Sequence, residues 1–217
     1  MSELNSFGFQ INNLLNYNRT FNRIHRINAV AGITYDERKS DNSVYRVEDF
    51  STFEFGVDQP FYGQSVTYPL EIRQTETQLF SYLARVNYTL KNRYVFTASF
   101  RADGSSKFRN DNKYGYFPSA AFAWRANNEP FIKNTNLFNE LKFRVGWGQT
   151  GNQAIRPYQT LANYGPELVA GPGNTTSIGF VPLNIGNSDL KWEFTEQVNA
   201  GLDFDFNFLP ISGSFDI

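Results

Sequence analysis

Six residues, Gly146-Trp147-Gly148-Gln149-Thr150-Gly151, match the G-x-G-x-x-G pattern of a dinucleotide-binding loop. That pattern holds a pyrophosphate only where it joins a strand to a helix, because backbone amides at the helix N-terminus supply the contacts. The residues that follow are rich in Gly, Pro and Asn and have no amphipathic helical pattern. We therefore expect no nucleotide cofactor, and we expect these glycines to thin one face of a strand or let it bend.

Side chains that could perform catalysis or bind a metal are few. The chain has one histidine, His25, and no cysteine, whereas a catalytic triad or a zinc site usually needs several such groups. Asp203 and Asp205 could pair as acid and base on one strand face. Asp103 and residues 110–112 could attract calcium, but their spacing lacks the Gly and Glu of an EF-hand. We expect solvated charges here, with no catalytic residue, metal or cofactor, and hence no enzyme.

The remaining polar and aromatic groups point to binding. Aromatic residues in long connections could stack on sugars or meet a partner protein, and they could equally pack the connections together; they are Phe61, Tyr62, Tyr68, Tyr158 and Tyr164. The substrate-binding candidates are Arg101, Asp103, Tyr158 and Tyr164. The net charge of -1 offers no basic surface for a nucleic acid, so we expect no such partner.

The elements that position these residues follow a period of two, which is typical of strands with one chemistry on each face. The clearest apolar face is Phe80, Tyr82, Ala84, Val86, Tyr88 and Leu90, with mostly polar residues between. About eight such segments are predicted, starting near Phe7, His25, Phe80, Tyr94, Tyr116, Leu141, Trp192 and Ile211. By parity, four arginines share the polar face: Arg85, Arg101, Arg125 and Arg144.

The predicted connections alternate in length. Short ones fall near residues 20–23, 91–93 and 209–210, and a medium one at 127–140 is expected to hold a helical turn capped by Asn128. Long ones are expected at about 40–78, 104–113 and 151–190. Short turns on one side and long loops on the other are typical of an outer-membrane barrel, with the periplasm below and the exterior above.

Aromatic residues make up 17% of the chain and gather near the predicted strand ends. Two interface girdles would place them there, at the level of the lipid headgroups. The expected girdle residues are Tyr88, Tyr94 and Trp124 beside short turns, and Tyr35, Tyr116, Trp147 and Trp192 on the loop side. No run of about 18 apolar residues predicts a membrane helix, and the first ten residues do not resemble a signal peptide.

Several short motifs follow one another along the second half of the chain. They are Tyr82-Leu83-Ala84-Arg85-Val86-Asn87-Tyr88, Arg101-Ala102-Asp103-Gly104-Ser105-Ser106-Lys107-Phe108, Tyr116-Phe117-Pro118-Ser119, Glu129-Pro130-Phe131, Gly148-Gln149-Thr150-Gly151-Asn152-Gln153 and Leu190-Lys191-Trp192-Glu193. In order and spacing, these motifs resemble the SusC/RagA-like, TonB-linked outer-membrane proteins of Gram-negative bacteria. The resemblance is strongest from about residue 80 to 207.

This resemblance implies an all-β, antiparallel transmembrane barrel of about 22 strands with an N-terminal plug, located in the cell outer membrane. It also implies import of oligosaccharides or peptides, energy from the TonB complex, and a SusD-like surface lipoprotein acting as a lid. Residues 1–217 would form a partial barrel domain of about eight strands, without the plug and without the segment that contacts TonB. The apolar face of each strand would meet outer-membrane lipid, and the polar face would line the lumen.

Two other architectures fit the same alternation. A soluble carbohydrate-binding β-sandwich would bury the apolar faces against each other, and a small self-contained eight-stranded outer-membrane barrel would pair the last strand with the first. A β-rich hydrolase would need a nucleophile and base, which the sequence does not offer.

Overall fold

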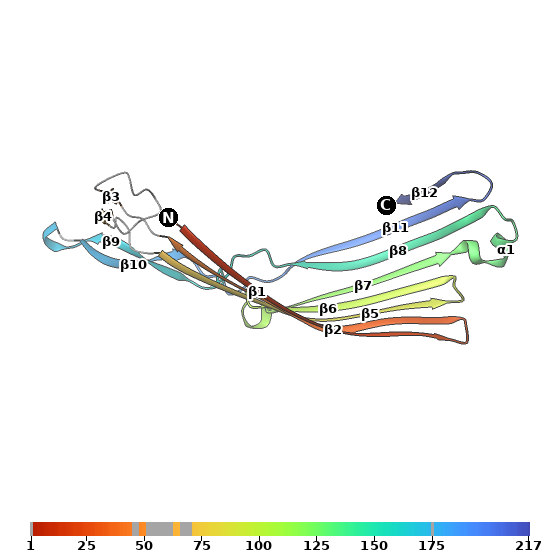
Figure 1. Ribbon diagram of the computed structural model, residues 1–217, viewed down its shortest axis with the longest axis horizontal. Coiled ribbons are helices and arrows are strands. Elements are labelled where there is room, and N and C mark those ends of the chain that lie inside the picture. Colours follow the sequence, from red (N-terminus) through yellow and green to blue (C-terminus); the bar gives the residue numbers. More distant parts are fainter. Residues whose placement is uncertain (1, 45–47, 51–62, 66–70, 175) are drawn as a thin grey trace.

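The computed structural model describes residues 2–44, 48–50, 63–65, 71–174 and 176–217. Its main feature is one antiparallel sheet with the strand order β1-β2-β5-β6-β7-β8-β11-β12 (Figure 1). The strands are β1 (Ser2–Phe21), β2 (His25–Val44), β5 (Glu71–Leu90), β6 (Tyr94–Ser105), β7 (Tyr114–Arg125), β8 (Phe138–Asn152), β11 (Glu193–Phe206) and β12 (Ser212–Asp216). No helix within these ranges is long and apolar enough to cross a membrane.

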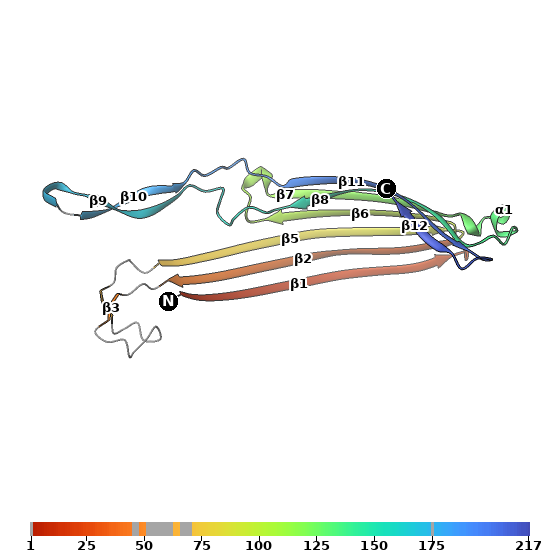
Figure 2. The ribbon, with the colours of Figure 1, turned by 90° about the horizontal axis from the view of Figure 1, so that it is seen from above.

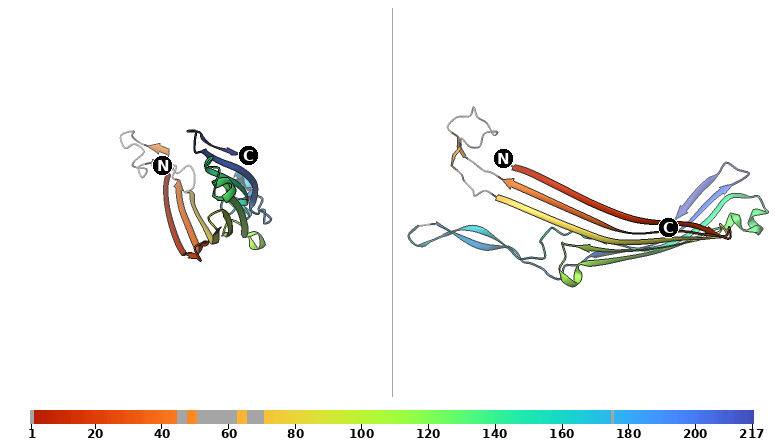
Figure 3. Two further views of the ribbon diagram at one scale, coloured as in Figure 1. Left: turned by 90° about the vertical axis from the view of Figure 1, so that its right-hand side faces the viewer. Right: turned by 60° about the horizontal axis from the view of Figure 1, so that its bottom comes forward.

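The sheet is open. Viewed from its end it curls into a trough, with β1 along one rim and β11 and β12 along the other (Figure 3). In the described part of the chain β1 pairs with β2, and β12 pairs with β11. The eight strands therefore form an open, curved wall, and the alternative of a small barrel closed by its first and last strands is not favoured.

The connections divide the sheet into two ends. At the short-turn end, β1 passes to β2 and β5 passes to β6 through tight turns, and β7 is joined to β8 by η3 (Ala126–Asn128) and α1 (Pro130–Lys133) (Figure 1). Both tight turns begin with two residues of positive φ, Asn22-Arg23 and Lys91-Asn92. That geometry matches the right-handed twist of the flanking strands.

At the opposite, long-loop end lie the two smaller sheets. They are the hairpin of β3 (Glu48–Phe50) with β4 (Gly63–Ser65), and the hairpin of β9 (Asn163–Ala170) with β10 (Thr176–Asn184). Short helical turns η2 (Asn110–Asn112) and η4 (Pro172–Asn174) occupy the connections there. The β9–β10 hairpin projects beyond the ends of β6 and β7 (Figure 2).

The strand register aligns the predicted apolar faces across the whole sheet. One row of cross-strand partners near the short-turn end runs through Phe21, His25, Leu90, Tyr94, Trp124, Phe143, Leu202 and Phe215. The next row includes Tyr88, Phe96, Phe122 and Val145. Phe96 is 46% exposed, and Val145 is exposed as well, so no second layer of the described chain covers this face. The β-sandwich alternative, which needs that face buried, is not favoured.

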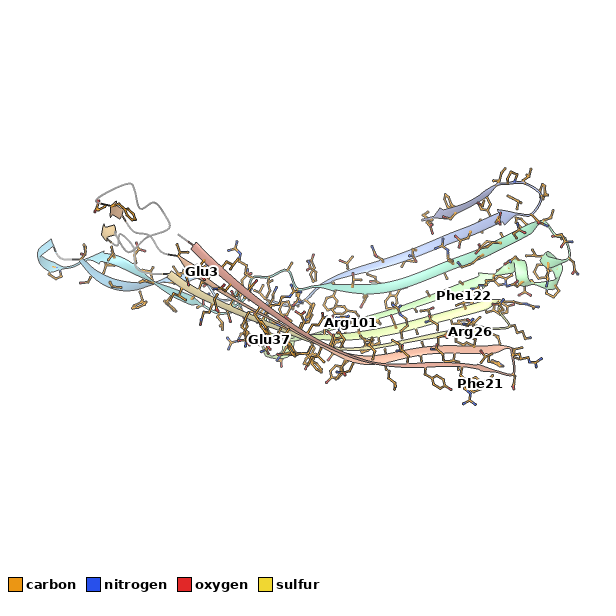
Figure 4. The ribbon with its side chains drawn as sticks, in the orientation of Figure 1. Glu3, Phe21, Arg26, Glu37, Arg101 and Phe122 are labelled. Carbon is orange, nitrogen blue, oxygen red and sulfur yellow. The ribbon has the colours of Figure 1, made fainter. Side chains whose placement is uncertain are left out.

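The length of the apolar face fits a membrane. Along β2 it runs from His25 to Tyr35, after which Glu37 and Lys39 occupy the same face. Ten residues at about 3.4 Å each span about 34 Å, and a strand tilt of about 40° reduces the height to about 26 Å. Outer-membrane barrels carry an apolar band about 25 Å tall. Figure 4 shows Phe21 and Glu37 on either side of this stretch.

Three sequence predictions about connections were wrong in detail. Strands β2 and β5 continue to Val44 and from Glu71, so they reach far into the predicted 40–78 loop. The predicted 151–190 loop contains the β9–β10 hairpin. The helical turn is present, but its N-cap is Glu129, and the Asn128 side chain instead donates a hydrogen bond to the Asn92 carbonyl.

Trp192, one of the predicted girdle residues, lies instead in a small buried cluster on the polar side of the sheet. Trp192 is only 4% exposed, with its ring centroid 5.3 Å from Phe108 and 5.4 Å from Phe117. Its indole Nε1 donates to the Lys113 carbonyl at 3.1 Å. The prediction that Trp192 lies in the outer girdle is wrong, because this residue precedes β11 and the strand alternation does not extend to it.

Candidate functional site

The polar face of the sheet is the surface on which the charged and hydrogen-bonding side chains converge. Thr97 Oγ1 donates to Asn87 Oδ1 at 2.8 Å across β5 and β6, and the hydroxyls of Ser99 and Ser119 lie 2.6 Å apart across β6 and β7. A hollow of about 550 Å³ extends from these residues toward β8 and β11. This face is therefore suited to water and to polar ligands, as the alternation predicted.

The glycine motif lies on β8 and thins this polar face. A Cβ atom added at Gly146 would lie 2.6 Å from Asn199 Oδ1, and one added at Gly148 would lie 3.0 Å from the Ser119 Cβ. No helix occurs between β8 and β9, so the strand–helix context of a dinucleotide site is missing from residues 153–162. The glycines allow close neighbours on the polar face, as expected.

Arg144, one of the four predicted arginines, forms ion pairs with two aspartates. Arg144 donates to both carboxylate oxygens of Asp203 at 2.9 and 2.7 Å and also reaches Asp216 at 3.0 Å. Lys142 donates to Asp203 at 3.1 Å. Since Asp203 accepts from two cations, it is engaged as a structural anion, and the pairing of Asp203 with Asp205 as acid and base receives no support from this geometry.

Arg101 and Asp103, two of the candidate binding residues, contact each other on β6. Arg101 Nε lies 2.6 and 2.8 Å from the two Asp103 oxygens, and its NH2 donates to the fully buried Ser81 hydroxyl at 3.0 Å. The Asp103 side chain is 10% exposed and that of Arg101 is 44% exposed. Asp103 is thus paired with a guanidinium, while the Arg101 side chain stays partly exposed on the polar face.

The two candidate tyrosines lie apart from this pair and from each other. Tyr158 follows β8, and its hydroxyl accepts a 3.0 Å hydrogen bond from the Glu76 backbone amide. Tyr164 lies on β9 and is 65% exposed. Phe61, Tyr62 and Tyr68, named with them in the sequence, lie outside the described residues. The structure therefore brings together only the Arg101 and Asp103 members of the candidate set.

Other residues singled out in the sequence have ordinary surroundings. His25 begins β2, and its Nδ1 lies 2.7 Å from the Tyr88 hydroxyl, both on the apolar face beside a short turn. Arg85 is exposed on β5, and Arg125 donates to Asn92 Oδ1 at 2.8 Å. Within the described ranges no three His, Cys, Asp or Glu side chains come close enough to hold a metal ion.

Glu129 organises the outer surface of the short-turn end. Its Oε1 accepts from the Tyr94 hydroxyl at 2.6 Å and from the Trp124 indole at 3.3 Å, and its Oε2 accepts from Arg93 at 2.9 Å. The Tyr94 hydrogen bond, followed by those of Trp124 and the charge of Arg93, holds the pKa of Glu129 below its usual range although burial opposes the shift. The polar tips of two aromatic residues are thereby satisfied next to the apolar band.

The β9–β10 hairpin carries an exposed apolar strip on one face. Cross-strand partners on that face are Tyr164 with Pro182, Pro166 with Phe180, and Leu168 with Ile178. Leu168 is 72% exposed and Phe180 is 74% exposed. Scattered apolar residues on a surface need no explanation, but a contiguous strip of this kind is typical of a protein-contact surface.

Several residues at these sites were not selected from the sequence. Lys107 and Gln153 meet at the long-loop end, where Lys107 Nζ lies 3.3 Å from the Gln153 carbonyl oxygen and Ser105 Oγ donates to Gln153 Oε1 at 2.6 Å. Both residues belong to motifs that carry the family resemblance, but Lys107 and Gln153 are 46 positions apart in the sequence. Sequence alone gave no signal for this contact, nor for the role of Glu129.

Comparison with known proteins identifies a single family over nearly the whole chain. A family model described as TonB dependent receptor-like, beta-barrel matches residues 2–215. TonB-dependent receptor P3 of Formosa agariphila is 36% identical over 204 residues, which are 94% of this chain and 20% of that protein. TonB-dependent receptor SusC of Bacteroides thetaiotaomicron is 43% identical over 145 residues, which are 65% of this chain and 14% of that protein.

Solved structures share the fold. The RagAB peptide transporter matches 99% of this chain and 23% of its own with a TM-score of 0.86 and 24% identity. The RagAB peptide importer in the open-open state matches 94% of this chain with a TM-score of 0.79 and 25% identity. The match covers 20% of the length of the Formosa agariphila relative and 14% of the length of the Bacteroides thetaiotaomicron relative.

Proposed function

Because the chain belongs to the TonB-dependent receptor-like β-barrel family, we propose that it forms part of the wall of a transporter that imports oligosaccharides or peptides. Proteins of this family are barrels of the bacterial outer membrane, and the eight-stranded sheet is a segment of such a barrel. The relatives are named as receptors and the solved neighbours as a peptide transporter or importer, which supports transport rather than catalysis.

The observation that carries this proposal is the opposite chemistry of the two sheet faces. One face presents exposed aromatic and aliphatic side chains over about 26 Å, which suits lipid. The other presents hydroxyls, amides and ion pairs, which suit an aqueous lumen. A spanning sheet must also satisfy its backbone hydrogen bonds internally, so the open edges of β1 and β12 would be completed by further strands of the same barrel.

The domain organisation and partners follow from the same proposal. Residues 1–217 form one partial barrel domain, and the plug and the contact with the TonB complex come from other parts of a longer protein. The SusD-like surface lipoprotein meets the long-loop end. The exposed strip of the β9–β10 hairpin supports this contact, since it projects beyond the apolar band, where lipid cannot cover it (Figure 2).

A thiol-accessibility experiment tests the proposal. Val198→Cys and Asn199→Cys place thiols at adjacent, exposed positions on opposite faces of β11 in a stretch that itself contains no cysteine. Any cysteine elsewhere in the full-length protein is first replaced by serine. In outer-membrane vesicles carrying the full-length transporter, a charged maleimide should label Asn199→Cys and not Val198→Cys, while a lipid-soluble maleimide should label Val198→Cys. Equal labelling of both thiols by the charged reagent would show that the apolar face does not meet lipid.

Deleting the gene should abolish growth on the imported oligosaccharide or peptide.

A further inference from the structure

A second hollow on the polar face, at the long-loop end, is built from parts of the chain that are distant in sequence. It has a volume of about 250 Å³ and lies among β1, β2, β5, β6 and the connections that follow β6 and β8. The side chains that matter for its chemistry are Gln10, Asp36, Arg38, Arg101, Lys107 and Gln153. At about 30 Å³ for each water molecule, this space holds about eight waters, so a small polar group of a ligand can enter it.

Arg101 reaches this hollow in a fixed orientation. The Asp103 carboxylate accepts from Arg101 Nε, and the buried Ser81 hydroxyl accepts from Arg101 NH2. A guanidinium has five N–H donors in a planar fork, and these contacts engage the Nε and NH2 atoms. Among the described residues none accepts a hydrogen bond from Arg101 NH1. The N–H donors of NH1 therefore remain available to a ligand.

Lys107 adds a second available cation. Its Nζ contacts the Gln153 carbonyl oxygen at 3.3 Å, and no carboxylate of the described chain lies within ion-pair distance of it. Its backbone amide donates to Ser105 Oγ at 3.2 Å, and Ser105 in turn holds the Gln153 side chain. Lys107 is therefore positioned by the same loop contacts that close this side of the hollow.

The charges and the side chains that line the hollow indicate which chemical group of a ligand it would bind. Arg38 is paired with Asp36 at 3.2 Å and Arg101 with Asp103, which leaves the charge of Lys107 uncompensated. Among the described residues no aromatic side chain lines the hollow, so they offer a sugar ring no stacking platform there. A planar anion that accepts two parallel hydrogen bonds matches the Arg101 fork, and a carboxylate is such an anion.

We propose that this hollow is a subsite for a carboxylate group of the transported ligand, in which Arg101 and Lys107 bind the carboxylate and Asp103 positions Arg101. The inference rests on the proposed import function, since it requires the polar face to line the lumen. The carboxylate could belong to a uronic acid of an acidic oligosaccharide or to the C-terminus of a peptide. These two sources share one chemistry, and separate probes distinguish them.

The test measures binding by the purified full-length transporter in lipid nanodiscs. The probes are an oligogalacturonide with a neutral oligosaccharide of equal length, and a tetrapeptide with its C-terminally amidated form. We expect one carboxylate probe to bind at least tenfold more tightly than its uncharged counterpart. Arg101→Gln and Lys107→Gln should each remove most of that preference, whereas Arg85→Gln, an exposed arginine on β5 outside the hollow, should change it less than twofold.

Asp103→Asn separates positioning from simple charge. This change removes a negative charge, so a purely electrostatic role predicts tighter carboxylate binding, whereas a positioning role predicts weaker binding. Arg101→Lys keeps the charge but not the fork and should also weaken binding. The proposal is overturned if neither carboxylate probe is preferred by the unaltered protein, or if the variants weaken charged and uncharged probes equally. The thiol-labelling experiment on β11 does not depend on this hollow. If that labelling contradicts the lipid and lumen faces, the proposed function fails; if the labelling is as expected and only the carboxylate preference is missing, the subsite alone fails.

Discussion

The hydroxyl of Tyr94 donates a 2.6 Å hydrogen bond to Oε1 of Glu129, although the two residues are 35 positions apart in the sequence. Tyr94 begins β6, and Glu129 lies between β7 and β8, so this bond joins two neighbouring turns on the side of the aromatic row. Trp124 and Arg93 bind the same carboxylate. Glu129 thereby joins the start of β6 to the end of β7 at the short-turn end.

Glu129→Gln is expected to destabilise the barrel at neutral pH. Because the pKa of Glu129 is lowered in the folded protein, ionised Glu129 contributes stability above the ordinary glutamate range. That contribution disappears as the pH falls from this range through the lowered pKa. Thermal unfolding in detergent should therefore show a gap between the original protein and the variant at pH 7 that narrows in acid. Glu140→Gln, at an exposed position on β8, should show no such gap.

Trp192→Ala is expected to destabilise the protein and to loosen the connection between β6 and β7 at the long-loop end. Trp192 packs against Phe108 and Phe117 and fixes the Lys113 carbonyl, so its removal leaves a cavity in the buried cluster. Loss of a buried Trp costs about 3 to 5 kcal/mol. Urea unfolding of the refolded protein should report this loss, and proteolysis should become faster near residues 106–113. Tyr164→Ala, at an exposed site, should cost less than about 0.5 kcal/mol.

Ala120 and Ala121 provide a matched test of which face meets lipid. Both are exposed alanines on β7, Ala120 beside Trp147 on the apolar face and Ala121 beside Thr97 on the polar face. Arginine near the bilayer midplane on the lipid face costs about 2 to 4 kcal/mol. Ala120→Arg should therefore lower the unfolding free energy in lipid vesicles by about that amount, and Ala121→Arg by less than about 1 kcal/mol. Equal losses would contradict the assignment of the faces.

Phe180→Ser is expected to weaken the contact with a surface lipoprotein. Phe180 is among the most exposed members of the hairpin strip, and exposed aromatic side chains often dominate binding. A loss of at least tenfold in affinity, about 1.4 kcal/mol, should appear when the two purified proteins are titrated. Val169→Ser, on the other face of the hairpin, is the matched control and should bind as the original does. Unchanged binding by Phe180→Ser would exclude the strip as the docking surface.

The sequence by itself determined the eight strands of the main sheet and their two faces, but not where β2 ends and β5 begins. Alternation with a period of two is a local property, because successive side chains in a strand point to opposite sides whatever the partner. This is why the polar-face positions of Arg85, Arg101 and Arg144 could be predicted from parity and agree with the cross-strand register. The short turns could be predicted for the same local reason, since Asn22 and Asn92 favour the positive φ that these turns require.

Only the tertiary structure decided which distant groups meet. Alternation holds only within a strand, and Trp192 lies just before β11 begins. The sequence therefore predicted an outward-facing Trp192, whereas in the structure its ring packs against Phe117. The contact of Lys107 with Gln153 depends on how two long connections fold over β5 and β6, and no local pattern encodes that distance. Alternation is equally compatible with a dry core and with lipid. The choice between them required the register of an open sheet whose apolar face no other described part of the chain covers.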